Sequence, residues 1–183
     1  MDAIAEITSY VQYIDFGERL RTLGFTEDTT EGAPLCRWVR ARIILDVMPL
    51  NEEILGFSNS WYKAAMQSSV TRRISTELEI RIVTAPYFLA TKLEAFRGRG
   101  EGNLGSHDLE DLALVVDGRA TLLSEVRAEQ HELRKYVRRE IRSLLTTSSD
   151  ALLGYLLPDA ASQSRISVIL KRLEDLASIE EES

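Results

Sequence analysis

Two aspartates at strand-like positions are the residues of this sequence best suited to hold a divalent cation. Asp46 lies inside the apolar run 42–48, whose residues alternate as in a β-strand. A carboxylate there needs a partner, because burying it unpaired is costly; an arginine is the common partner, and a metal ion is the alternative. Asp2 begins a second strand-like segment, 2–7. On an adjacent strand, Asp2 would share a Mg²⁺ ion with Asp46 and with substrate phosphates.

A lysine and two further aspartates lie on two consecutive predicted helices. Lys92 belongs to a helix predicted over 86–97, and Arg99 follows it two turns later. Asp108 and Asp111 are spaced i, i+3 at the start of the next helix, so their side chains share a face. Acids are favoured in the first turn of any helix, which is sufficient to explain them. The alternative interpretation is a basic pair that contacts nucleotide phosphates, with the two acids orienting it.

Two other features have both a structural and a functional interpretation. The segment 100–105 reads GEGNLG, but it follows a helix rather than a strand, so it is not a dinucleotide-binding fingerprint. It remains a candidate phosphate-facing loop. Arg134, Arg138 and Arg142 lie on one face of a predicted helix. A solvated face paired with neighbouring glutamates is the simpler explanation, and an RNA-binding face is the other.

The composition indicates a soluble protein of the cytoplasm. Hydrophobic residues make up 44% and charged residues 28% of 183 residues, and no stretch is long and apolar enough to span a bilayer. A single cysteine, Cys36, excludes an internal disulfide and suits a reducing compartment. The net charge of −7 argues against a surface that coats nucleic acid.

The apolar pattern predicts the elements that would position these side chains. A first helix is expected over 10–23, with Tyr10, Ile14, Leu20 and Leu23 as its apolar stripe. Strands are expected over 35–39 and 42–48, joined at residues 40–41, and over 77–84. Helices follow to the end of the chain. Their buried stripes are predicted to be Leu89, Leu93 and Phe96; Leu109, Leu112, Ala113 and Val116; Leu133, Val137, Ile141 and Leu144; and Ile166, Ile169, Leu173 and Leu176.

This order of elements predicts an α+β protein with two parts. Residues 1–118 would form a mixed β-sheet core, and residues 119–183 a helical C-terminal region packed on it.

The order of the motifs resembles that of the AbiEii-like nucleotidyltransferases. The strings that carry the resemblance are DAIAEI (2–7), RIILDVMP (42–49), APYFLATKLEAFRGRG (85–100) and SHDLEDLALVVDGR (106–119). The resemblance implies a nucleotidyltransferase-like core in which Asp2, the second acid of an Asp-x-Asp motif, and Asp46, the third carboxylate, bind metal. It also implies that Lys92, in a Lys-x-x-Ala motif, contacts phosphates together with Arg99. Asp108 and Asp111, in an Asp-x-x-Asp-Leu motif, would orient the lysine or activate the acceptor.

The activity implied is transfer of a nucleotidyl group from a Mg²⁺-bound nucleoside triphosphate to a hydroxyl of RNA or protein. Members of this group are often the toxin of a toxin–antitoxin or phage-defence pair, so an antitoxin partner is implied as well. Loss of the family's upstream segment would leave an apolar face or a strand edge uncovered, so a homodimer partner is the other expectation. The first acid of Asp-x-Asp and the upstream glycine motif would precede Met1. We therefore expect a shortened or degenerate relative with little transferase activity, and the alternative is a non-catalytic protein-interaction module that keeps the fold.

Overall fold

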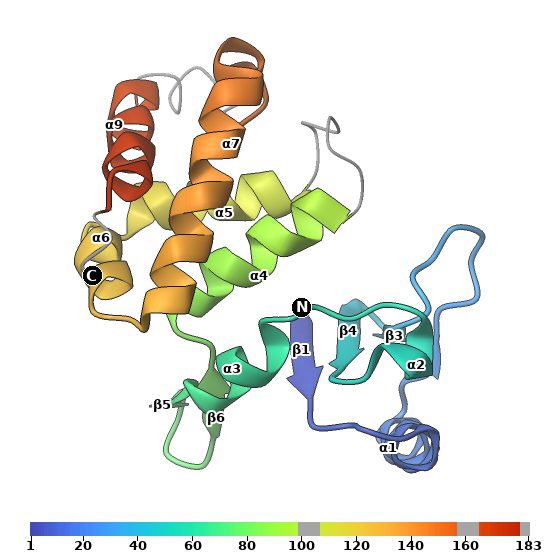
Figure 1. The fold of residues 1–183 in the computed structure, drawn as a ribbon. Helices are drawn as coiled ribbons and strands as arrows, with labels where there is room; N and C mark the ends of the chain where they lie inside the picture. The colour runs from blue at the N-terminus through green and yellow to red at the C-terminus, as the bar shows by residue number, and fades with distance from the viewer. Residues whose placement is uncertain (99–106, 157–164, 180–183) are drawn as a thin grey trace. The chain divides into compact units, whose positions relative to one another are not determined.

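The chain forms two compact units, each described here by itself. The computed structural model describes residues 1–98, 107–156 and 165–179, and the N-terminal unit comprises Met1–Met66 while the C-terminal unit comprises Gln67–Ser183. Strands and helices are mixed in both units, as the predicted α+β class requires (Figure 1). The division between the units falls near residue 66, whereas the sequence suggested a boundary near 118.

A four-stranded mixed sheet forms the centre of the N-terminal unit. In the order in which they pair, its strands are β1 (Asp2–Ala5), β4 (Ile43–Pro49), β3 (Arg37–Arg40) and β2 (Thr26–Glu27). β1 runs parallel to β4, and the other neighbours are antiparallel. The parallel pair needs a crossover connection, which is provided by α1 (Tyr10–Thr22) and the β2–β3 segment.

Helix α1 packs against one face of this sheet through small and aromatic residues. Leu20 of the helix is buried in one cluster with Trp38 and Val47 of the sheet. Gly17 lies where the helix crosses Trp38, and a Cβ atom at residue 17 would lie 3.2 Å from the indole ring, which is tighter than most such contacts. The side chain of Ser9 caps the start of the helix by accepting a hydrogen bond from the backbone N–H of Gln12.

The predicted apolar stripe of this first helix is wrong in three of its four residues. Tyr10, Ile14 and Leu23 are exposed, and only Leu20 is buried. The face that packs on the sheet instead carries Tyr13, Phe16, Gly17 and Leu20. A glycine in the middle of the buried face conceals the pattern, because it contributes no apolar side chain although its position is fully covered.

The hairpin of β3 and β4 turns one residue later than predicted. Arg40 pairs with Ile43, so the turn lies at residues 41–42, and Ala41 adopts a positive φ of 51°. Moving a turn by one residue shifts the pairing by two residues along the strands. In the observed register, Arg37 lies opposite Asp46.

The strand predicted near residues 77–84 pairs in a sheet of its own. β6 (Glu79–Ile82) is antiparallel to β5 (Val70–Arg73), and the two make a separate two-stranded sheet in the C-terminal unit. The segment before it contains the short helices α2 (Glu52–Leu55) and α3 (Tyr62–Gln67). β5 has the sequence VTRR, whose two arginines hide a strand from apolar patterning.

The remainder of the C-terminal unit is helical. Its helices are α4 (Ala85–Gly98), α5 (His107–Gly118), α6 (Leu122–Arg127), α7 (His131–Leu156) and α9 (Ile166–Ala177). α7 packs beside α4 and α9, and α5 packs on α4 and α9 (Figure 1). The predicted stripes of α5 and α7 are fully buried, and in α4 and α9 only Phe96 and Ile166 are partly exposed. Within the described ranges, no helix is both long enough and apolar enough to cross a bilayer.

Candidate functional site

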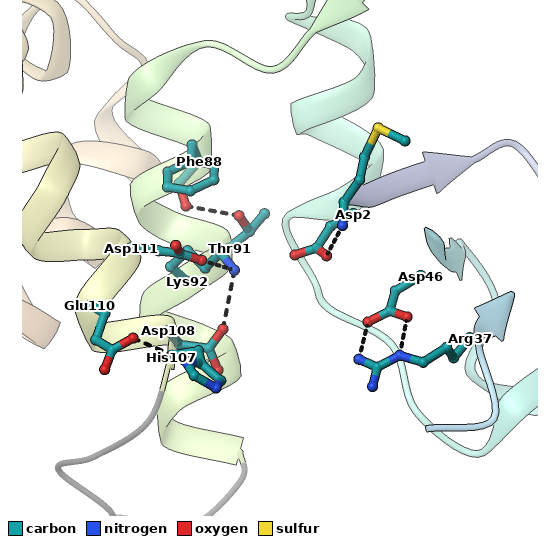
Figure 2. Close-up of polar contacts among 11 residues, drawn as sticks. Asp2, Arg37, Asp46, Phe88, Thr91, Lys92, His107, Asp108, Glu110 and Asp111 are labelled. Atoms are coloured by element: carbon teal, nitrogen blue, oxygen red, sulfur yellow. Dashed lines mark hydrogen bonds and ion pairs between the residues drawn. The ribbon is translucent and has the colours of Figure 1, made fainter. Parts of the chain in front are cut away.

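A lysine shared by two carboxylates is the main polar cluster of the helical unit. The Nζ atom of Lys92 lies 2.6 Å from Oδ2 of Asp111 and 3.3 Å from Oδ1 of Asp108 (Figure 2). Only 13% of the Lys92 side chain and 6% of the Asp108 side chain are exposed, against 40% for Asp111. The cluster therefore has one buried acid and one acid that meets solvent.

The spacing of the two helices explains why these side chains meet. Lys92 precedes Leu93, so it lies at the edge of the buried face of α4. On α5, Asp108 and Asp111 are one helical turn apart, and both lie beside the buried residues that include Leu109. Packing these two faces together brings the ammonium group of α4 to the first turn of α5, where acids are also favoured by the helix dipole.

An aromatic ring of the same helix lies beside the ammonium group of Lys92. The Phe88 ring, one turn earlier, has its centroid 5.6 Å from the Lys92 Nζ atom, a distance at which a ring face attracts a cation. The Thr91 hydroxyl donates a hydrogen bond of 2.8 Å to the carbonyl of Phe88 (Figure 2).

His107 is a second basic group at the start of α5. Its Nδ1 atom lies 2.9 Å from Oε2 of Glu110, and 94% of its side chain is exposed. The hydrogen bond to Glu110 raises the pKa of His107, because the carboxylate stabilises the imidazolium form. The contact with Glu110 is local to the first turn of α5.

Asp2, Asp46 and Arg37 form one row across three strands of the N-terminal sheet. The register pairs Asp2 with Asp46 on the parallel strands β1 and β4, and pairs Arg37 with Asp46 on the antiparallel strands β3 and β4. Residues paired in this way project from the same face of a sheet. The two aspartates predicted to share a cation are therefore neighbours on one face (Figure 2).

Asp46 already has a cationic partner in this row. The Nε atom of Arg37 donates to Oδ1 and its Nη2 atom donates to Oδ2, both at 2.8 Å. Only 14% of the Asp46 side chain is exposed, and the hydrogen bonds from Arg37 to this carboxylate raise the pKa of the guanidinium. The arginine considered as a partner for Asp46 is therefore found, and it is Arg37.

Sequence reasoning missed Arg37 because it placed the hairpin turn at residues 40–41. That turn would set Leu35, rather than Arg37, opposite Asp46. No residue marks the true position of the turn, since the two-residue turn is Ala41–Arg42 and neither residue is a glycine or an asparagine.

The predicted site residues fall into two groups, one in each compact unit. Asp2 lies with Asp46 in the N-terminal unit, and Lys92 lies with Asp108 and Asp111 in the C-terminal unit. Arg99 and the glycine-rich segment 100–105 lie outside the described residues. Within the described ranges there is no group of three or more histidine, cysteine or acidic side chains that could hold a metal ion. The pair of carboxylates suits Mg²⁺ only together with phosphate and water oxygens.

The arginines that suggested an RNA-binding face bond to the ends of neighbouring helices. Arg142 of α7 donates to the carbonyl of Ala177 at 2.8 Å, at the end of α9. Arg134 donates to the carbonyl of Arg127 at 3.3 Å, at the end of α6. Carbonyl groups at a helix C-terminus have no partner within the helix, and a cation is favoured there. These arginines therefore have a structural use that neither interpretation of the sequence included.

Comparison with known proteins identifies no matching family model, no matching curated protein and no matching solved structure.

Proposed function

We propose that this chain is a nucleotidyltransferase-like protein of the AbiEii-like kind that binds a nucleoside triphosphate with Mg²⁺. The observation that carries the proposal is the Lys92 cluster, in which one ammonium group is held by a buried and a half-exposed carboxylate. An ammonium group has three donors and rotates freely, so a phosphate oxygen can replace Asp111 while Asp108 keeps the lysine in place. Mg²⁺, for which Asp2 and Asp46 are the candidate ligands, would offset the negative charge of the phosphates.

Each side chain of the two groups has a role in this proposal. Asp2 and Asp46 bind the cation from one face of the sheet. Lys92, assisted by Arg99, binds the phosphates. Asp108 positions the lysine, and Asp111 is available to accept the proton of the acceptor hydroxyl on RNA or protein.

The proposal is tested by calorimetric titration of the chain with each of the four nucleoside triphosphates, with and without Mg²⁺. We expect Mg²⁺-dependent binding that is lost in Lys92→Met and retained in Lys171→Met. Lys171 is the matched control, because it is 70% exposed and its ion pair with Asp175 is local to α9. Transfer from an α-phosphate-labelled nucleotide to RNA and to protein is then measured. Equal binding by the two lysine variants, or no binding by folded wild-type chain, would overturn the proposal.

A second function, a non-catalytic interaction module, is supported by the hairpin of β5 and β6. One face of this hairpin carries five apolar side chains that are 38–58% exposed, while the other face carries polar residues and the Arg73–Glu79 ion pair. The apolar side chains are Val70, Ile74, Leu78, Ile80 and Ile82. A two-stranded hairpin is marginally stable in water and gains from covering its apolar face.

This second function predicts an assembly with an antitoxin-like protein or a homodimer. Sedimentation of wild-type chain and of Ile80→Lys over a hundredfold range of concentration distinguishes the two. A mass that rises with concentration only in the wild type indicates a homodimer through the hairpin. A constant monomer mass directs the search to a different protein, and retention of nucleotide binding in Ile80→Lys shows that the two functions are separate.

A further inference from the structure

The apolar face of the β5–β6 hairpin has a charged side chain at its middle. Arg72 pairs with Ile80, and paired residues on adjacent strands project from the same face. The neighbouring pairs on that face are Val70 with Ile82 and, next to the turn, Ile74 with Leu78. The six side chains of this face are therefore five hydrocarbon groups around one guanidinium, and none of them is a carboxylate.

The next arginine along the strand, on the opposite face, has the acidic partner that Arg72 lacks. Arg73 donates to Oε1 of Glu79 from Nε at 3.1 Å and from Nη2 at 2.9 Å. Among the residues that the structure describes, the exposed side chain of Arg72 makes no hydrogen bond and no ion pair. A purely apolar cover would bury this guanidinium without a partner, which is costly. The face is therefore complementary to an apolar surface that brings a carboxylate of its own.

The size of the face limits the shape of what covers it. Five residue positions along each strand, at about 3.3 Å per residue, and two strands about 4.8 Å apart give a face of roughly 16 Å by 10 Å. That is well below the roughly 800 Å² that each partner buries in a stable interface between globular proteins. An α-helix is about 10 Å wide and rises about 1.5 Å per residue, so roughly eleven residues of a single helix cover the face.

We propose that this face binds an amphipathic helix of another protein, and that the helix carries one acidic residue within its apolar stripe. The carboxylate pairs with Arg72, and the apolar side chains around it cover the hydrocarbon groups of the hairpin. A second copy of this chain is a poorer match, because a two-fold contact would bring two Arg72 guanidinium groups into one small interface with no carboxylate between them. The inference rests on the second function proposed above and adds the chemistry of the partner.

Selection from a displayed library of random helical peptides of about twelve residues tests this chemistry. We expect the wild-type chain to select peptides with apolar residues at helical spacing and an aspartate or glutamate among them. Arg72→Glu should select lysine or arginine in that place, because the charge of the face is reversed. In fluorescence anisotropy, a peptide selected by the wild type should bind Arg72→Gln at least about tenfold more weakly. Arg73→Gln is the matched control, since it removes the same charge from the opposite face, and it should change the affinity by less than about twofold.

The variant Ile80→Lys separates the chemistry of the partner from the second function itself. It should abolish binding of the selected peptide, and Leu78→Lys replaces it if Ile80→Lys does not fold. Peptides that lose binding in Ile80→Lys but carry no carboxylate, or bind Arg72→Gln as tightly as wild type, would overturn the acidic partner and leave the interaction module in place. Selection of no peptide by the folded chain would overturn both. A wild-type dimer that Ile80→Lys converts to a monomer would assign the face to a second copy and would also overturn this proposal.

Discussion

In the part of the chain that the structure describes, each compact unit has a partly buried basic side chain held by aspartate, and the two arrangements differ in how that side chain is shared. In the N-terminal unit, Arg37 makes two hydrogen bonds to one carboxylate on the adjacent strand. In the C-terminal unit, Lys92 is shared by two carboxylates from the next helix, at unequal distances and with unequal exposure. The guanidinium of Arg37 binds both oxygens of a single carboxylate, whereas the ammonium group of Lys92 is shared between two carboxylates.

The difference follows from the geometry of the elements that carry the side chains. Paired residues on adjacent strands lie at a fixed short separation, which suits the planar fork of arginine. Two helices packed at an angle leave a wider gap, which a long lysine crosses as a compact charge. A guanidinium fixed by both oxygens is hard to displace, while an ammonium that contacts a half-exposed acid exchanges that partner readily. The C-terminal cluster is therefore the better adapted of the two to receive a ligand without rearrangement.

The largest effect is expected when the lysine is removed from the helical cluster. Lys92→Met leaves Asp108, which is 4% exposed, without its ammonium partner, and breaking such a buried pair costs about 3–5 kcal/mol. Urea unfolding should show this loss in the free energy of unfolding. Lys92→Met combined with Asp108→Asn should recover part of it, because the buried charge is gone. A loss below about 1 kcal/mol in the single variant would mean that Asp108 does not depend on the lysine.

A smaller effect is expected when arginine is replaced by lysine in the sheet. Arg37→Lys keeps the charge but loses one of the two hydrogen bonds to Asp46, and a hydrogen bond to a charged group contributes about 1.5–3 kcal/mol. We expect a loss of about that size in urea unfolding. Arg40→Lys, on the same strand, should be neutral. An unchanged free energy of unfolding in Arg37→Lys would mean that the second hydrogen bond to Asp46 contributes nothing to stability. The contrast between the arginine of the sheet and the lysine of the helices would then not hold.

The smallest effect concerns an ion pair whose partners are both more exposed. Arg165 hydrogen-bonds Asp117 with Nε to carboxylate distances of 2.7 and 2.8 Å, and this hydrogen bond lowers the pKa of the carboxyl below its ordinary value of 3.8. A lowered pKa stabilises the folded state above the ordinary value, and the contribution is lost as the pH falls through the folded-state pKa. Asp117→Asn should therefore cost about 0.2–1 kcal/mol at pH 7 and progressively less below pH of about 4. Urea unfolding of the wild type and of Asp117→Asn at pH 7 and below pH of about 4 checks this. A cost of the substitution that does not change with pH would contradict it.

The helical cores were predictable because their burial follows from local spacing. Leu109, Leu112 and Val116 recur at helical intervals on a segment with polar residues between them, and they are all fully buried. The meeting of Lys92 with Asp111 required only that two neighbouring amphipathic helices pack by their apolar faces. The pairing of Asp2 with Asp46 agrees with the supposition that their strands are adjacent, although the apolar pattern alone does not determine which strands pair.

The features that escaped prediction depend on single residues or on pairing far along the chain. Ala41 occupies a positive-φ turn position that a glycine or asparagine would have signalled, and this concealed the register that joins Arg37 to Asp46. Gly17 concealed the buried face of α1, because the need for it comes from Trp38 on a distant strand. The hairpin of β5 and β6 was only half visible, since Arg72, which pairs with Ile80 on the apolar face, and Arg73 on the other face interrupt the apolar pattern of the first strand.

The arginines that close the helix ends bear on the order in which the protein forms during synthesis. Arg172 of α9 donates to the carbonyl of Val116, at the end of α5 and 56 residues earlier in the chain. Helix α5 therefore emerges from the ribosome well before the side chain that satisfies its last turn has been made. Until then its terminal carbonyl groups are left to water and its apolar stripe has no α9 to pack on. In the N-terminal unit, the sheet and the helix that packs on it lie within the first 66 residues, so all of their partners have been synthesised before the C-terminal unit begins.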